Sequence, residues 1–470
     1  MIRGNQNIKN IHMVGIAGSG MSGIAEILVS LGYSVQGSDI NLGKTRQYFK
    51  DLGITFFCEH DAGNLDNVDL VVYSGAIDKS NIELVTASNK NIPILRRAEM
   101  LADLMSYRFG IAVSGSHGKT TTTSMVAHIL TYAGMDPTYV IGGQVMQFSS
   151  HARLGQSEYL VVEADESDGS FIHMKPKIAV ITNIEDDHLD HYNYSMDDLI
   201  QGFRDFVQNI PFDGLILANG DDLMVRTALK DIGRKILFYG RLEENELVIK
   251  RHQFAFNTTT IELIYKGNEL GSIKIKTPGQ HNVFNAVAAV AVALSLGIDW
   301  ELIQNALTEF NGIKRRFEFI GAYKINKFET VIYSDYAHHP TEIAVTIETA
   351  KEVYPEKDIV TIFQPHRYSR TAMLKDKIAE ALSKSNKILL LDIYGAGEKN
   401  NLEVTSKDIV DVIDRDFNGK DIFLVGIDEI EKTIDERLQK DSVLLFMGAG
   451  EINLIAEDYV KFNEKKACVA

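Results

Sequence analysis

The chain of 470 residues has only two cysteines, Cys58 and Cys468, and no long hydrophobic segment. Cysteines so far apart cannot supply a disulfide framework or a cysteine metal site, so we expect a reducing compartment. The longest apolar stretch, residues 286–298, is too short to cross a bilayer, and the first residues lack the apolar core of a signal peptide. The sequence therefore predicts a cytoplasmic protein that is neither exported nor embedded in a membrane.

Positive charge is also scarce, because 48 lysines and arginines against 64 acidic residues leave a formal net charge of −16. This balance argues against general affinity for nucleic acid or anionic membranes, so an anionic ligand must be bound by local positive sites. Otherwise the composition is ordinary, with 45% hydrophobic and 24% charged residues. Such values exclude a mainly disordered or fibrous protein and predict several well-packed domains.

Short apolar segments alternate with longer helical patterns, which is typical of βαβ units around a parallel sheet. The alternation starts three times, at residues 11–14, 110–113 and 331–333. We therefore predict an α/β fold of three consecutive domains, with boundaries near residues 107 and 319. The predicted domains are 1–107, 108–319 and 320–470. Residues 247–275 alternate Ile and Thr with charged residues and predict an antiparallel hairpin beside the second sheet.

The first glycine-rich turn follows residues 11–14 and carries Gly-x-Gly-x-x-Gly at Gly18, Gly20 and Gly23. Such glycines let backbone N–H groups approach a pyrophosphate at the N-terminus of the next helix. Asp39 ends the second predicted strand, where an acid commonly contacts a ribose hydroxyl. The pattern fits NAD, a UDP-type diphosphate, or a tight turn without any ligand. Further candidate contacts to the diphosphate ligand are Ser19, Met21, Ser22 and Ser74.

The second glycine-rich turn, residues 115–122, also lies between a predicted strand and a helix. Its backbone amides can surround phosphates, Lys119 can reach the terminal phosphates, and Thr120 offers a hydroxyl to Mg²⁺. Val113 stands where the full phosphate-loop pattern has glycine, but the flanking strand and helix favour a nucleoside triphosphate site. We expect this loop to be exposed. The candidate nucleotide-binding residues are Gly115, Ser116, His117, Gly118, Lys119, Thr120 and Thr121.

Acidic residues follow the next predicted strands. Glu163 ends an apolar strand at the sheet edge where ligands bind, so it is placed to hold Mg²⁺ beside a triphosphate. The alternative is a solvated acidic turn. His188 follows the next strand and is a candidate for a second metal site, although a single histidine there is more often a surface residue.

Polar residues also precede an alanine-rich helix and follow strands of the third predicted domain. Asn282 and Asn285 suit a purine edge, although N-capping of the helix explains their spacing equally well. Arginines at strand ends offer bidentate contacts to phosphate or carboxylate, or are solvated loop residues. The candidates at the entrance to and inside the third domain are Arg316, Asp335, Tyr336, His338, Arg367 and Arg370.

Five separated motifs resemble, in this order, those of the Mur ligase family of peptidoglycan synthesis, which includes the folylpolyglutamate synthases. They lie at residues 15–25, 96–101, 163–168, 335–342 and 363–367. The resemblance covers nearly the whole chain and is nearest to the branch that joins L-alanine to UDP-N-acetylmuramate. It implies a Rossmann-like N-terminal domain that binds UDP rather than NAD, a central P-loop ATPase-like α/β domain, and a Rossmann-like C-terminal domain that closes on the active site.

The resemblance also implies roles for individual residues. Lys119 would contact the ATP phosphates, Thr120 and Glu163 would hold one Mg²⁺, and His188 would help to hold a second. The two asparagines would approach the adenine, and the candidates of the third domain would be contributed from the closing side. Several relatives use a carbamylated lysine downstream of the metal histidine, whereas residues 202–204 here contain no lysine, as in the alanine-adding branch.

The residues fit an ADP-forming acid–amino-acid ligase. A triphosphate site beside Mg²⁺ ligands and arginines can form an acyl phosphate, and the same cations stabilise charge as the amine attacks. We expect ATP and Mg²⁺ as cofactors, UDP-N-acetylmuramate and L-alanine as substrates, no nucleic-acid or membrane partner, and a monomer or weak homodimer. The alternatives are a ligase that attaches a whole tripeptide to the same acceptor, an NAD-dependent oxidoreductase, and a nucleotide-binding module without catalysis. Lys119, Glu163 and His188 argue against the last two.

Overall fold

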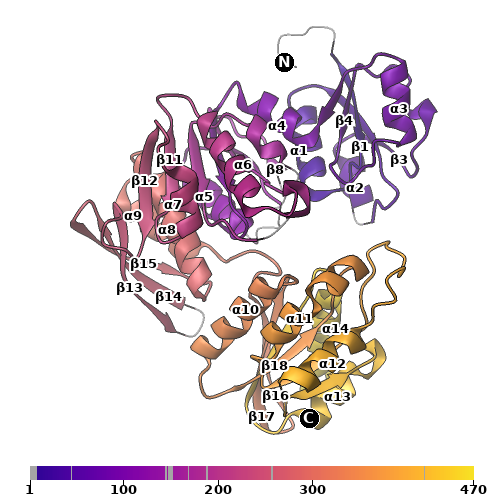
Figure 1. Ribbon diagram of the computed structural model, residues 1–470, viewed down its shortest axis with the longest axis vertical. Helices are drawn as coiled ribbons and strands as arrows, with labels where there is room; N and C mark the ends of the chain where they lie inside the picture. Colours follow the sequence, from indigo (N-terminus) through magenta and orange to yellow (C-terminus); the bar gives the residue numbers. More distant parts are fainter. Residues whose placement is uncertain are drawn as a thin grey trace. The chain divides into compact units, whose positions relative to one another are not determined.

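The structure is a computed structural model (Figure 1) that describes residues 8–43, 45–142, 146, 152–167, 169–186, 189–255, 258–417 and 419–469. The strands form three sheets. Contacts divide the chain into two compact units. The first unit comprises Met1–His252, Thr260–Ile275 and Asn282–Asn311, and the second comprises Gln253–Thr259, Lys276–His281 and Gly312–Ala470.

The first sheet is parallel, with the strand order β3-β2-β1-β4-β5. Its strands are β1 (Asn10–Val14), β2 (Ser34–Ser38), β3 (Thr55–Phe57), β4 (Leu70–Tyr73) and β5 (Ile94–Arg96). Its helices are α1 (Ser19–Ser30), α2 (Thr45–Asp51), η1 (Ala62–Leu65), α3 (Ile82–Asn89) and α4 (Arg97–Met105). The strand order reverses between β1 and β4, so the glycine-rich turn after β1 lies at the switch point where such sheets bind ligands.

The central sheet has ten strands in the order β15-β14-β13-β12-β11-β10-β6-β9-β7-β8. The strands are β6 (Phe109–Ser114), β7 (Thr138–Val140), β8 (Ala152–Arg153), β9 (Tyr159–Glu163), β10 (Ile178–Ile181), β11 (Leu215–Asn219), β12 (Lys235–Gly240), β13 (Leu247–Ala255), β14 (Thr258–Tyr265) and β15 (Asn268–Ile275). The helical segments are α5 (Lys119–Tyr132), η2 (Ser170–His173), η3 (Leu189–Tyr192), α6 (Met196–Gln208), α7 (Leu223–Leu229), α8 (Gln280–Ser295) and α9 (Trp300–Glu309). Because β6 pairs in parallel with both β9 and β10, the loops after these three strands lie side by side.

The prediction of a two-stranded hairpin at residues 247–275 is wrong in the number of strands. Three strands, β13 to β15, occupy this segment and continue the central sheet. A two-residue turn separates β14 from β15, and both of its residues, Lys266 and Gly267, have positive φ angles of 51° and 80°. This conformation is typical of a tight hairpin turn. The alternation of apolar and polar residues continues on both sides of this short turn. For this reason the sequence pattern did not show that β14 and β15 are separate strands.

The third sheet has the order β16-β17-β21-β18-β19-β20, in which only the β16–β17 pair is antiparallel. Its strands are β16 (Glu318–Ile325), β17 (Phe328–Asp335), β18 (Asp358–Phe363), β19 (Lys387–Leu390), β20 (Asp421–Leu424) and β21 (Ser442–Met447). Its helical segments are α10 (Pro340–Val353), α11 (Tyr368–Leu382), α12 (Ser406–Asp416), η4 (Ile427–Glu429), α13 (Ile430–Arg437) and α14 (Ile452–Val469).

Helices cover both faces of the third sheet (Figure 1). Along β18, Ile359 and Phe363 pack in the core that contains residues of α10, α11 and α12. Val360 and Ile362 pack in the opposite core with residues of α13 and α14. A strand buried on both faces reads as a continuous apolar run, which is why this sheet was predictable.

The three sheets confirm the predicted fold class. The domain boundaries near residues 107 and 319 stay a prediction, and the second falls at the start of β16. No helix in the described part of the chain is long and apolar enough to cross a membrane.

Candidate active site

The predicted phosphate loop, residues 115–118, connects β6 to α5 and needs its two glycines for steric reasons. Gly115 and Gly118 have φ angles of 133° and 83°, which disfavour residues with a side chain. A Cβ built on Gly115 would lie 2.1 Å from Thr182 Oγ1, and one on Gly118 would lie 2.3 Å from Asn285 Oδ1. Val113, the departure from the full pattern, is a buried residue of β6, so the backbone around the loop does not require glycine there.

Lys119, the first residue of α5, is held by the loop and by a buried carboxylate. Its Nζ lies 2.8 and 2.9 Å from the two carboxylate oxygens of Glu166 and 2.7 Å from Gly115 O. The Lys119 and Glu166 side chains are 15% and 1% exposed. Burial lowers the pKa of Lys119, but the negative charges of Glu166 and Asp165 outweigh it and raise the pKa above its ordinary value. The prediction that this loop is exposed is therefore wrong for its lysine.

Glu163, at the end of β9, and Thr120, in the first turn of α5, bring two oxygen ligands together. Thr120 Oγ1 donates to Glu163 Oε2 over 3.2 Å, and Gly142 N donates to Glu163 Oε1 over 2.6 Å. Burial raises the pKa of the Glu163 carboxyl. A hydroxyl and a carboxylate are ligands that Mg²⁺ accepts, so this pair fits the predicted metal. His188 lies outside the described residues, and within them no group of three histidine, cysteine or acidic residues could hold a metal ion.

The remaining residues of the loop are fixed by its neighbours. His117 N donates to Asn183 Oδ1 over 2.8 Å, and Ser116 Oγ accepts a hydrogen bond from Glu185 N over 2.9 Å. Both partners follow β10, so the two loops form one structure. Thr121 is 7% exposed and faces inward from the first turn of α5.

Asn282 and Asn285 lie within α8 and are buried, with exposures of 3% and 5%. Asn285 Oδ1 accepts a hydrogen bond from Thr122 Oγ1 over 3.2 Å, and Asn285 Nδ2 donates to Asn282 Oδ1 over 3.3 Å. Because α8 begins at Gln280, neither asparagine is the N-cap. The structure places Asn285 against the phosphate loop, beside Gly118.

The first glycine-rich turn is braced by Asp39, which follows β2. Asp39 Oδ2 accepts from Ala17 N over 3.0 Å, and its Oδ1 accepts from Asn41 N over 2.9 Å. Gly18 is the N-cap of α1. Ser74 follows β4, and its N donates to Val14 O over 3.1 Å.

Two glycines of this turn are required by packing. A Cβ built on Gly20 would lie 2.6 Å from Arg97 Nη1, and one on Gly23 would lie 2.8 Å from Ala152 Cβ in the central sheet. Met21 is buried, so its side chain faces the core. Ser22 is also buried. The glycines of this pattern therefore have structural roles in addition to any contact with a ligand.

In the second unit, the last residue of β17, Asp335, organises the cluster formed by the third-domain candidates. Asp335 accepts hydrogen bonds from Phe317 N and Ala337 N, both over 2.7 Å. Burial raises the pKa of Asp335 to about 6, although Arg316 opposes this change. Arg316 Nη1 lies 3.3 Å from Glu342 Oε1.

Aromatic and histidine rings extend this cluster towards β18. The guanidinium carbon of Arg316 lies 5.5 Å from the ring centre of Tyr336, whose carbonyl oxygen is 3.0 Å from His338 Nδ1. The rings of His338 and His366 are 6.2 Å apart, and Arg370 Nη1 lies 3.2 Å from His366 Nδ1. Burial and the charge of Arg370 lower the pKa of His366 to about 4.

Arg367 and Arg315 flank the cluster. Arg367 is exposed and has a φ of 70° at the N-cap of α11. Arg315, which was not among the predicted site residues, donates through Nη2 to Gly448 O over 2.7 Å and to Gly450 O over 2.9 Å. It ties the loop after β21 to this edge. The adjacent Arg-Arg pair was its only sequence signal.

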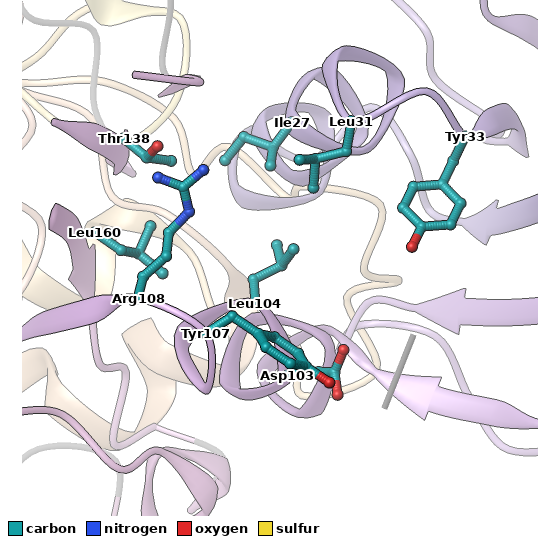
Figure 2. A pocket seen from close by; sticks show the side chains of 9 residues that line it. All are labelled: Ile27, Leu31, Tyr33, Asp103, Leu104, Tyr107, Arg108, Thr138 and Leu160. Atoms are coloured by element: carbon teal, nitrogen blue, oxygen red, sulfur yellow. The ribbon is translucent and has the colours of Figure 1, made fainter. Parts of the chain in front are cut away.

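An apolar pocket of the first unit lies away from these residues (Figure 2). It is lined by Ile27, Leu31, Tyr33, Asp103, Leu104, Tyr107, Arg108, Thr138 and Leu160. The α1 and α4 residues among them come from the C-terminal ends of both helices, whereas the glycine-rich turn and Arg97 are at the N-terminal ends. The pocket therefore contains none of the predicted site residues.

Family comparisons agree with the three sheets. Residues 10–109 match the Mur ligase family, catalytic domain, residues 113–293 match the Mur ligase middle domain, and residues 315–450 match the Mur ligase, glutamate ligase domain.

Individual relatives match over nearly their whole length. A UDP-N-acetylmuramate–L-alanine ligase of Hydrogenobaculum sp. (strain Y04AAS1) is 42% identical over 97% of this chain and 99% of its own. One from Hydrogenovibrio crunogenus is 42% identical over 96% and 98%. Among solved structures, UDP-N-acetylmuramate-alanine ligase from Thermotoga maritima has a TM-score of 0.81 at 31% identity, covering 97% and 99%. A murein peptide ligase from Psychrobacter arcticus has a TM-score of 0.70 at 25% identity, covering 96% and 98%. This chain belongs to the Mur ligase family.

Proposed function

We propose that this chain is an ATP-dependent ligase that joins L-alanine to the carboxylate of UDP-N-acetylmuramate and releases ADP and phosphate. The observation that carries the proposal is the juxtaposition of Lys119, in a glycine-rich loop at a helix N-terminus, with the Thr120–Glu163 pair. Two relatives 42% identical over nearly the full chain bear the name of this activity, which supports the choice of substrates.

The proposed reaction uses the charge of Lys119 and the oxygen ligands of Thr120 and Glu163. The acceptor carboxylate attacks the γ-phosphorus of ATP, the bond to ADP breaks, and an acyl phosphate forms. Lys119 neutralises charge on the transferred phosphoryl group, for which it must exchange Glu166 for phosphate oxygens. The amine of L-alanine then attacks the acyl carbon, and phosphate leaves with one oxygen of the original carboxylate.

Mg²⁺ belongs to this proposal as the partner of Thr120 and Glu163. Their side-chain oxygens are 3.2 Å apart and are of the ligand type that the ion prefers. When bound there, the ion would neutralise phosphate charge during transfer. His188 stays a candidate for a second metal site, and Asn282 and Asn285 stay candidates for the adenine side.

The tripeptide-attaching ligase is the less favoured alternative. The murein peptide ligase structure is less similar, with a TM-score of 0.70 against 0.81 for the alanine ligase of Thermotoga maritima. An oxidoreductase is disfavoured because a phosphate loop with Lys119 and Glu163 has no use in hydride transfer. We further propose that the protein acts in the cytoplasm as a monomer or weak homodimer, with domain boundaries near residues 107 and 319.

Phosphate release with a panel of amines tests the proposal. L-Alanine should be the best amine, glycine and L-serine slower, and tripeptides inactive, each reaction requiring ATP and UDP-N-acetylmuramate. UDP-N-acetylmuramate should raise the melting temperature and NAD should not. Efficient use of a tripeptide would assign the chain to the alternative ligase, and stabilisation by NAD with hydride transfer would favour the oxidoreductase.

A further inference from the structure

Arg97 lies between the two predicted ligand sites of the first unit. It is the first residue of α4, and its Nη2 lies 3.4 Å from Asp165 Oδ2 in the acidic loop after β9. Its Nη1 lies over the glycine-rich turn, because a Cβ built on Gly20 would be only 2.6 Å away. One guanidinium therefore contacts both the turn predicted to hold the acceptor and the loop that follows Glu163 and carries Glu166.

This guanidinium has unused hydrogen-bonding capacity. An arginine offers five N–H donors in a planar fork, and among the described residues Asp165 is the one hydrogen-bonding partner of Arg97. The two side chains are 27% and 34% exposed, so the pair is partly open to solvent. Free donors on a charged, partly exposed fork suit a phosphate or a carboxylate.

The N-terminus of α1 adds a second source of positive potential at the same place. Its N-cap is Gly18, which makes no side-chain capping hydrogen bond. The first N–H groups of a helix have no intrahelical partners and carry partial positive charge. Because the Arg97 fork covers Gly20 in the first turn of this helix, an anion bound by the helix would also meet the guanidinium.

We propose that Arg97 binds an anionic group of the acceptor at the N-terminus of α1, and that Asp165 positions the guanidinium for this contact. The proposal rests on the proposed function, because it takes a nucleotide-diphosphate sugar acid as the acceptor. The anionic group is the diphosphate or the sugar carboxylate, which share the chemistry that an arginine fork recognises.

The position of Asp165 links the two substrates. Asp165 pairs with Arg97, and the next residue, Glu166, pairs with Lys119 of the phosphate loop. An anion that draws Arg97 towards α1 therefore acts on the loop that also holds Lys119. Acceptor and nucleotide should bind with coupled affinities, and the coupling must be equal in both directions.

Calorimetry on the full chain tests the contact. Affinity for UDP-N-acetylmuramate should fall at least about tenfold in Arg97→Ala and less in Arg97→Lys, which keeps the charge without the fork. UDP should weaken by the same factor if the diphosphate is the contact. UDP and UDP-N-acetylglucosamine, which lack the carboxylate, should keep their affinities if the carboxylate is the contact.

Asp165→Asn separates positioning from simple electrostatics. Removing a negative charge near an anion should by itself tighten the binding of UDP-N-acetylmuramate. Loss of the positioning of Arg97 should instead weaken this binding several-fold, and this is the result that we expect. In both Arg97→Ala and Asp165→Asn, a non-hydrolysable ATP analogue should no longer change the acceptor affinity. Arg251→Ala is the matched control, because Arg251 is 75% exposed and pairs with Glu262 at 2.6 Å, so it should bind like the wild type.

The outcomes are distinct. Wild-type acceptor affinity in both Arg97 variants would overturn the proposal, and tighter binding in Asp165→Asn would overturn the positioning role. If Arg97→Ala does not fold, Arg97→Lys and Asp165→Asn carry the test. A wild-type chain that does not bind UDP-N-acetylmuramate would contradict the proposed function itself, and this inference with it.

Discussion

Lys119 and Glu166 form a largely buried ion pair inside the proposed nucleotide site, with Nζ 2.8 and 2.9 Å from the two carboxylate oxygens. The carboxylate occupies the partner position that phosphate oxygens would take when ATP is bound. Lys119 therefore has a structural role without nucleotide in addition to its proposed role in phosphoryl transfer. The two roles can be separated by mutation.

Lys119→Ala should lower kcat at least about a hundredfold, as expected for loss of one group that stabilises a transition state. It should also destabilise the protein by about 3–5 kcal/mol, because Glu166 remains buried without its cation. Phosphate release and thermal unfolding measure the two effects. The double variant Lys119→Ala/Glu166→Gln should recover much of the melting temperature and none of the activity. Near wild-type turnover in Lys119→Ala would exclude this loop as the ATP site.

Glu83 gives the first sheet a pH-dependent stability. It is buried in α3, and its carboxylate accepts from Asn64 Nδ2 over 2.7 Å and lies 3.3 Å from His12 Nε2. Burial alone would raise its pKa, but the close contact with His12 and hydrogen bonds from Ser38 and Asn64 outweigh burial and lower the pKa to about 2. The stabilisation is present above the ordinary pKa of 4.5 and is lost as the pH falls towards 2.

Glu83→Gln should therefore destabilise the protein by up to about 3 kcal/mol at pH 7, and the difference from wild type should shrink below pH 4.5. Urea unfolding at pH 7 and pH 4 measures it. Glu262→Gln is the control, since Glu262 forms an exposed pair with Arg251 and such pairs contribute little. A loss of stability that is independent of pH would contradict the assigned role of the Glu83 charge.

Arg367→Ala should reduce turnover strongly and leave the affinity for UDP-N-acetylmuramate nearly unchanged. Arg367 is exposed after β18 in the second unit, whereas the acceptor candidates belong to the first. Turnover at saturating ATP and calorimetry with the acceptor measure the two quantities. Arg415→Ala, which removes an arginine 64% exposed and paired with Asp416, should change neither. Lost acceptor binding in Arg367→Ala would overturn this division of roles.

The fold and the site loops were predictable because their signals are local. Strands buried on both faces appear as apolar runs, and glycines mark turns such as Gly115, where a side chain would collide with Thr182. The pairs Lys119–Glu166 and Arg97–Asp165 join residues 47 and 68 positions apart. No spacing rule indicates which of several neighbouring acids meets which cation, because sheet order and helix packing decide it.

The most direct test of the account follows the oxygen of the acceptor carboxylate. UDP-N-acetylmuramate labelled with ¹⁸O in its carboxylate should react with ATP and L-alanine, and the released phosphate should be analysed by mass spectrometry. If the carboxylate attacks the γ-phosphorus, each phosphate carries one ¹⁸O atom, because the acyl phosphate breaks at the carbon side. Unlabelled phosphate released together with the L-alanine product would contradict the acyl phosphate and the central claim.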